Sequence, residues 1–142
     1  DVSHLLDNET LEEFRFLLNY KFDSESLLAV VLVGQTELWD CKLKLQRYAA
    51  IRQRIDMYCV LPHLDRAETE AYIMSHMKYA GCVQDIFTAK AIDEIYKESA
   101  GIPRMINRIC EKALLYAFQQ QKRLIDDYMI KFVVEHEMLA LQ

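Results

Sequence analysis

Two helical patterns in this chain are joined by a corner of two residues, Gly101 and Ile102, after which Pro103 opens the second pattern. Glycine adopts the positive φ that ends a helix at little steric cost, and proline suits a first helical turn, where its missing N–H would be unpaired anyway. Arg104 is therefore predicted to lie in the first turn of a new helix. Such a corner either only redirects the chain, with Arg104 in solvent, or aims Arg104 at a phosphate. The local pattern alone favours the plain corner, so the rest of the chain has to decide.

The part of the chain that surrounds this corner has a helical pattern throughout. Four helices are expected, with starts predicted at Asp65, Thr88, Pro103 and Asp126 or Asp127. The first start has the Asp-x-x-Glu spacing of a capping box, and the others have a capping side chain or proline at the expected place. Three glycines and two prolines in 142 residues also favour helices over a hairpin-rich β fold.

The first part of the chain has a different character. A continuous apolar run at 27–33, ended by Gly34, favours a strand buried on both faces, as in a parallel sheet. Residues 55–61 are a second strand candidate, and 37–51 between them are expected to be helical. Since a sheet of two strands is marginal, further strands are expected upstream. The chain also lacks an initiator methionine, so we expect a fragment or a processed product.

The formal net charge of −5 is unevenly distributed. Residues 1–40 carry two basic and nine acidic side chains, whereas residues 41–61 carry five basic and one acidic. The acidic total argues against broad coating of nucleic acid, but the basic segment keeps a local contact with phosphate possible.

Cysteine and histidine spacing indicates neither a metal site nor a disulfide framework. The residues concerned are Cys41, Cys59, Cys82 and Cys110, and His4, His63, His76 and His136. None forms a C-x-x-C pair. The chain start has neither the basic nor the apolar region of a signal peptide, and no run is long and apolar enough to cross a membrane. Reduced thiols in a cytoplasmic protein are therefore expected.

Five short motifs occur in a fixed order along nearly the whole chain. They are Asp1-Val2-Ser3-His4-Leu5-Leu6, Leu11-Glu12-Glu13-Phe14-Arg15, Val31-Leu32-Val33-Gly34-Gln35-Thr36-Glu37-Leu38, Ile51-Arg52-Gln53-Arg54-Ile55 and Gly101-Ile102-Pro103-Arg104-Met105-Ile106-Asn107. In this order they resemble the second half of an AAA+ ATPase module. More narrowly, the chain resembles the secretion-pathway A-type ATPases and the transposition helper ATPases related to them.

The resemblance implies a mostly α chain in two domains. Residues 1–61 would be the C-terminal part of the AAA+ α/β nucleotide-binding core, a P-loop remnant of about two parallel strands with helices. Residues 62–142 would be a four-helix lid. The implied cofactors are ATP and Mg²⁺ in a full-length parent, which would assemble into an oligomer and bind nucleotide between its subunits.

The resemblance also assigns a role to individual residues. Asp1 matches the Walker B aspartate that holds Mg²⁺ beside the phosphates. Gln35 matches the sensor-1 residue that orients the attacking water or the γ-phosphate. Arg54 matches the arginine finger offered to a neighbouring subunit, with Arg52 as the alternative, because a bidentate cation suits charge that develops in the transition state. Arg104 matches the sensor-2 arginine of the lid, which contacts the γ-phosphate.

Two departures from the family pattern bear on activity. The family has Asp-Glu-Ala-His where this chain has Asp1-Val2-Ser3-His4, and Val2 cannot act as the catalytic base that the glutamate provides. Either hydrolysis is impaired, or the acidic pair is shifted by one and Asp1 takes the second role. The 142 residues also contain no G-x-x-x-x-G-K-[ST] motif, the Walker A phosphate cradle. Residues 1–142 alone are therefore expected to be inactive.

Several functions stay open at this point. The parent could act in secretion-complex assembly with secretion machinery as its partner, or in transposition with transposase and duplex DNA. Residues 65–142 could instead be a non-enzymatic helical protein-interaction domain. A helix-turn-helix DNA reader centred on 99–107 is disfavoured, because Glu94, Glu98 and Glu111 would repel phosphate.

Overall fold

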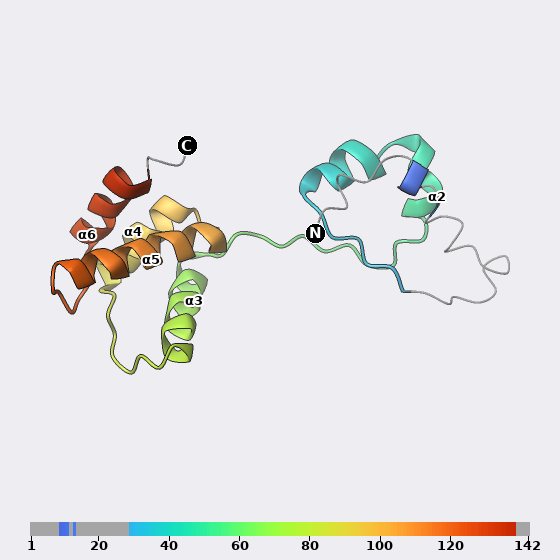
Figure 1. Cartoon of the computed structure of the whole chain (residues 1–142). Helices are drawn as coiled ribbons and strands as arrows, with labels where there is room; N and C mark the ends of the chain where they lie inside the picture. The colour runs from blue at the N-terminus through green and yellow to red at the C-terminus, as the bar shows by residue number, and fades with distance from the viewer. Residues whose placement is uncertain (1–8, 12, 14–28, 139–142) are drawn as a thin grey trace. The chain divides into compact units, whose positions relative to one another are not determined.

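A computed structural model describes residues 9–11, 13 and 29–138 of the chain (Figure 1). The chain divides into two compact units, Asp1–Val60 and Leu61–Gln142. The described residues are mostly helical, as predicted, and their only β-type pairing is an isolated bridge between Phe87 and Ile125. None of the described helices combines the length and the apolar character needed to cross a bilayer.

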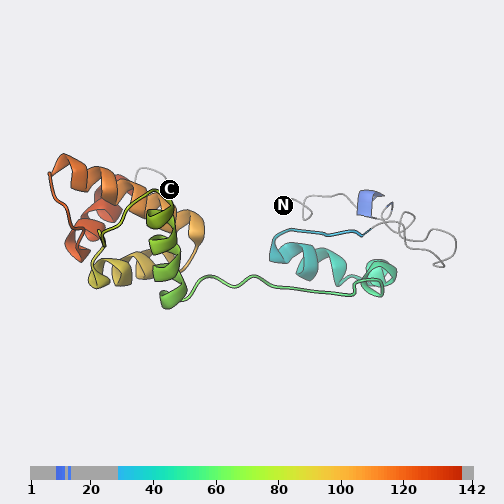
Figure 2. The same ribbon diagram turned by 90° about the horizontal axis from the view of Figure 1, so that it is seen from below.

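The second unit contains the four helices that the sequence predicts. They are α3 (Arg66–Tyr79), α4 (Ala89–Ser99), α5 (Pro103–Gln119) and α6 (Asp127–Val133), and a π-helical turn, η5 (Val134–Met138), continues the last one. Figure 2 shows the same helices from below.

Side-chain caps fix where three of these helices begin. The Asp65 carboxylate accepts the amide of Glu68 at 2.8 Å, and the Glu68 carboxylate accepts the amide of Asp65 at 2.9 Å, which completes the predicted capping box. Thr88 and Asp126 each accept the amide three residues further on, at 3.2 and 2.9 Å. The helix boundaries in this unit are therefore encoded locally.

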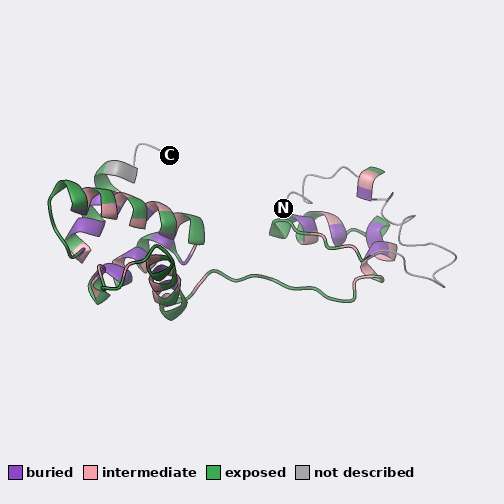
Figure 3. Cartoon of the chain, turned by 60° about the horizontal axis from the view of Figure 1, so that its bottom comes forward, coloured by how far each residue is buried: buried purple, intermediate pink, exposed green. Residues whose placement is uncertain are grey.

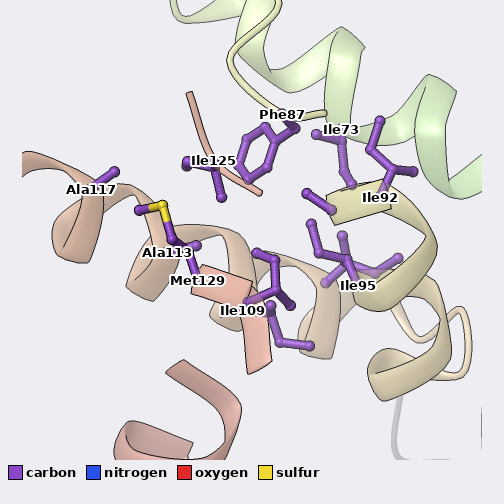
Figure 4. Packing of buried hydrophobic residues seen from close by; sticks show 12 residues of the cluster. Ile73, Phe87, Ile92, Ile95, Ile109, Ala113, Ala117, Ile125 and Met129 are labelled. Atoms are coloured by element: carbon purple, nitrogen blue, oxygen red, sulfur yellow. The ribbon is translucent and has the colours of Figure 1, made fainter. Parts of the chain in front are cut away.

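The core of the second unit lies where α6 packs against α4 and α5. Helix α5 contributes four side chains at helical spacing, namely Ile106, Ile109, Ala113 and Ala117, which are all buried. Ile95 of α4 and Met129 of α6 lie among them, and Phe87 and Ile73 close the cluster from the side of α3 (Figure 4). The burial colouring in Figure 3 shows that these helices also carry exposed residues along their length.

The first unit is helical in short pieces. Its described elements are a π-helix η3 (Leu38–Leu43), a 3-10 turn η4 (Gln46–Tyr48) and a single α-helical turn α2 (Ala49–Arg52). The continuous helix predicted over 37–51 is therefore wrong. Leu45 has an extended backbone (φ −64°, ψ 145°), and this break brings Leu43 and Tyr48 into one small core with Leu11 and Ile51.

The two strands predicted at 27–33 and 55–61 are not formed in the described residues, which exclude 27 and 28. Val31 is 81% exposed and Leu61 is 87% exposed, so neither segment is buried on both faces. A strand needs a hydrogen-bonded neighbour, and two such segments alone make a marginal sheet. The α/β layer implied by the resemblance thus has no counterpart among the described residues.

Candidate functional site

The corner between α4 and α5 has the tight geometry that the sequence predicts. Ala100 and Gly101 both have left-handed backbones, with φ of 49° and 71°. The amide of Gly101 donates to the Ser99 hydroxyl at 3.3 Å, and the amide of Ile102 donates to the Ser99 carbonyl at 3.0 Å. Because Ser99 itself is buried, these bonds fix the corner to the body of the unit.

Gly101 also forms a long-range contact with the start of α3. The amide of Leu64 donates to the carbonyl of Gly101 at 3.0 Å. A Cβ atom on Gly101 would lie only 1.9 Å from the carbonyl oxygen of Leu64, so no other residue fits without a backbone shift. Leu64 immediately precedes Asp65, the N-cap of α3. The corner before α5 is thereby joined to the segment through which the chain enters the second unit.

Arg104 lies in the first turn of α5, directly after Pro103, as predicted. Its side chain is exposed, and the first turn of α5 contains no acidic residue. The N-terminus of a helix carries a partial positive charge, which adds to that of the guanidinium. The position is therefore suited to bind an anion such as a phosphate group.

Gln35 follows a segment without regular secondary structure and is exposed. Its carbonyl accepts the amide of Leu38 at 3.0 Å, which begins the turn into η3. The predicted location at the end of a buried strand is not found, because no strand is formed at 29–33.

The two candidate finger arginines differ in their contacts. Arg52 donates through Nη1 to the carbonyls of Leu43 and Leu45, at 2.5 and 2.9 Å, and so closes the break between η3 and η4. Arg54 follows α2 and donates through Nη1 to the carbonyl of Ala50 in that helix at 2.9 Å. Arg52 thus links separate parts of the first unit, and both arginines have contacts within that unit.

Asp1 and Val2 lie outside the described residues. Of the remaining predicted site residues, Gln35 and Arg54 belong to the first unit and Arg104 belongs to the second. The described residues contain no cluster of three or more His, Cys, Asp or Glu side chains that could hold a metal ion.

Sequence reasoning missed two features of the second unit. The contact of Leu64 with Gly101 has no sequence signal, because it joins residues far apart in the chain. Arg66 of α3 forms ion pairs with Glu70 and, at 2.8 Å, with Asp93 of α4, and these carboxylates raise the pKa of the guanidinium further. The first pair has the i,i+4 spacing that a sequence can show, but the link to α4 requires the fold.

Comparison with known proteins gives one informative similarity. The chain is 43% identical to General secretion pathway protein A of Aeromonas hydrophila over 119 residues. The relative is a secretion-pathway protein. The match includes 83% of this chain but 21% of the relative, so the chain spans about a fifth of that protein's length. No family model matches the chain, and no solved structure matches it. The similarity supports the secretion-related interpretation.

Proposed function

We propose that this chain is the C-terminal part of an AAA+ ATPase module that couples ATP binding and hydrolysis to an oligomeric switch in secretion-complex assembly. The observation that carries the proposal is the 43% identity to a general secretion pathway protein over 119 residues, which is 83% of this chain. The exposed Arg104 on a fixed helix start supports it. The parent protein would act in the cytoplasm.

Arg104 would act as the nucleotide sensor of this module. Its place in the first turn of α5 lets the guanidinium and the helix terminus act together on a γ-phosphate. Any movement of α5 towards the phosphate would pull on the corner at Gly101 and, through the hydrogen bond to Leu64, on the entry to α3. The loss of the γ-phosphate would thus be transmitted to the segment that leads into the lid.

The other site residues would complete the arrangement between subunits. Arg54 would meet the nucleotide of a neighbouring subunit, where its charge stabilises the transition state. Gln35 would orient the attacking water, and Asp1 would hold Mg²⁺. ATP with Mg²⁺ supplies the phosphoryl group whose hydrolysis resets the switch. Since residues 1–142 contain no phosphate cradle, we expect no appreciable ATP turnover from this chain alone.

Turnover by the natural full-length protein tests the role of Arg54. We expect Arg54→Ala to lower ATP turnover by about 10³-fold, in the range known for arginine fingers, without weakening ATP binding. Arg54→Ala subunits should regain partial turnover when they are mixed with subunits that lack a functional phosphate cradle. In such mixed oligomers the second kind of subunit supplies Arg54 to the nucleotide that the first kind binds. Wild-type turnover by Arg54→Ala would contradict this assignment.

Duplex DNA added to the same assay separates the two biological roles. A secretion ATPase should show no stimulation by DNA. Stimulation that falls steeply with salt would instead indicate phosphate contacts and favour a transposition helper, because such contacts release counterions. Absence of nucleotide binding by the full-length protein would leave the non-enzymatic interaction domain.

A further inference from the structure

An open, mostly apolar groove lies between the loop after α3 and the C-terminal end of α5. Its volume is about 520 Å³, and its lining includes Val83, Ile86, Leu114, Phe118, Lys122 and Arg123. Val83 is 97% exposed and Phe118 is 81% exposed, so both large apolar side chains that line the groove face solvent. Open walls of this kind suit a polypeptide segment better than an enclosed small molecule.

Both walls of the groove are helix ends with defined hydrogen bonds. At the end of α3, Gly81 has a φ of 83°, and the amide of Cys82 donates to the carbonyl of Met77 at 2.9 Å. At the end of α5, Gln121 has a φ of 53°, and the amide of Lys122 donates to the carbonyl of Ala117 at 2.9 Å. The left-handed residue and the six-to-one hydrogen bond are the Schellman arrangement in both cases.

The loops that follow these two helix ends are also joined to each other. The amide of Ile125 donates to the carbonyl of Ile86 at 2.8 Å, and the amide of Thr88 donates to the carbonyl of Ile125 at 3.0 Å. Ile125 is fully buried. The groove is therefore pre-formed, and little binding free energy is spent on ordering the loops when a partner enters it.

The charge of the groove has one sign. Lys122 and Arg123 line it, no acidic residue does, and neither cation has an ion-pair partner among the described residues. Two adjacent cations beside exposed apolar side chains are complementary to carboxylates beside an apolar side chain. A second copy of the chain fits less well, because a two-fold contact through this patch would bring the same cations together.

We propose that this groove binds an acidic amphipathic segment of a partner protein. An apolar side chain of the partner would lie between Val83 and Phe118, while its carboxylates would pair with Lys122 and Arg123. Arg104 lies at the other end of α5, whose 17 residues span about 25 Å. Arg104 therefore does not line the groove, and the proposed binding does not depend on the proposed nucleotide role.

Fluorescence anisotropy with a labelled synthetic helix tests this proposal on the 142-residue chain. The probe carries leucine at every third or fourth position and glutamate between, and a second probe replaces each glutamate by lysine. We expect the glutamate probe to bind at least about tenfold more tightly than the lysine probe. Phe118→Ala should lower the affinity for the glutamate probe about tenfold or more, and the double change Lys122→Glu with Arg123→Glu should do the same.

Two variants serve as matched controls for exposure and residue type. Tyr79→Ala removes an aromatic ring that is 95% exposed and does not line the groove, and Lys90→Glu reverses an exposed charge on α4. Both should bind the glutamate probe as the wild type does, and circular dichroism should show that all variants stay folded.

Equal affinity for the two probes, no binding of either, or unchanged binding by the charge-reversal variant would overturn the proposal. Self-association in sedimentation velocity that Phe118→Ala abolishes would also overturn it, since the occupant would then be a second copy.

Discussion

At the scale of single residues, the structure distinguishes two glycines that look alike in the sequence. Gly81 and Gly101 both follow helices and have positive φ, but a Cβ atom at Gly81 would have open space around it, whereas one at Gly101 would meet Leu64. We expect Gly81→Ala to cost about 1 kcal/mol of stability and Gly101→Ala about 2 kcal/mol or more, because only the second adds a backbone clash to the strain. Urea unfolding of both variants measures the difference, and equal costs would contradict the contact.

Cys110 is expected to be the least reactive of the four thiols. Burial raises its pKa to about 12, whereas Cys41 and Cys59 are exposed. Labelling with a disulfide reagent at about pH 8 should therefore modify Cys41 and Cys59 quickly and Cys110 only after unfolding, since the thiolate is the reactive form. Fast labelling of Cys110 in the folded chain would show that this site is open.

The raised pKa of Cys110 also predicts a dependence of stability on pH. The unfolded thiol ionises near its usual pKa of 9.0, while the folded thiol stays protonated up to about 12. The contribution of Cys110 to the free energy of unfolding is complete below about pH 9 and is lost as the pH rises towards 12. The free energy of unfolding of Cys110→Ala should therefore decline less steeply over this pH range than that of the wild type.

At the scale of elements, helix starts are the part of the fold that local sequence determines. Asp65→Ala removes the carboxylate that accepts the amide of Glu68, while the backbone amide that donates to the Glu68 carboxylate remains. We expect a loss of about 1 kcal/mol in thermal or urea unfolding. Asp85→Ala, at an exposed position outside any helix, should change stability by less than about 0.5 kcal/mol. Equal effects would mean that the cap contributes nothing.

The elements that the sequence could not predict depend on contacts remote in the chain. The four helices of the second unit could be placed because their starts are recognisable from the adjacent sequence, as the caps Asp65, Thr88 and Asp126 show. The break at Leu45 allows Leu43 and Tyr48 to pack in a core with Leu11. No local sequence pattern indicates this packing, because Leu11 is remote in the chain. The strand prediction at 27–33 relied on a short apolar run rich in β-branched residues, and such runs form strands only where other strands pair with them.

At the scale of the whole molecule, the candidate site is only partly predictable. The position of Arg104 follows from Gly101 and Pro103, which shape the corner locally. The sequence resemblance assigns the finger to Arg54 with Arg52 as the alternative, whereas the backbone carbonyls that each guanidinium contacts follow only from the fold. The two units have separate cores, and Gln35 and Arg54 belong to the first unit whereas Arg104 belongs to the second.

ATP binding and turnover by the natural full-length protein, compared between Arg104→Ala and Lys90→Ala, test the central claim most directly. The two variants are matched, because both remove an exposed cation from the second position of a helix in the same unit. We predict that Arg104→Ala lowers turnover at least tenfold, while Lys90→Ala leaves it unchanged. Equal turnover by both variants and the wild type would contradict the nucleotide role of Arg104 and leave the corner as a structural turn.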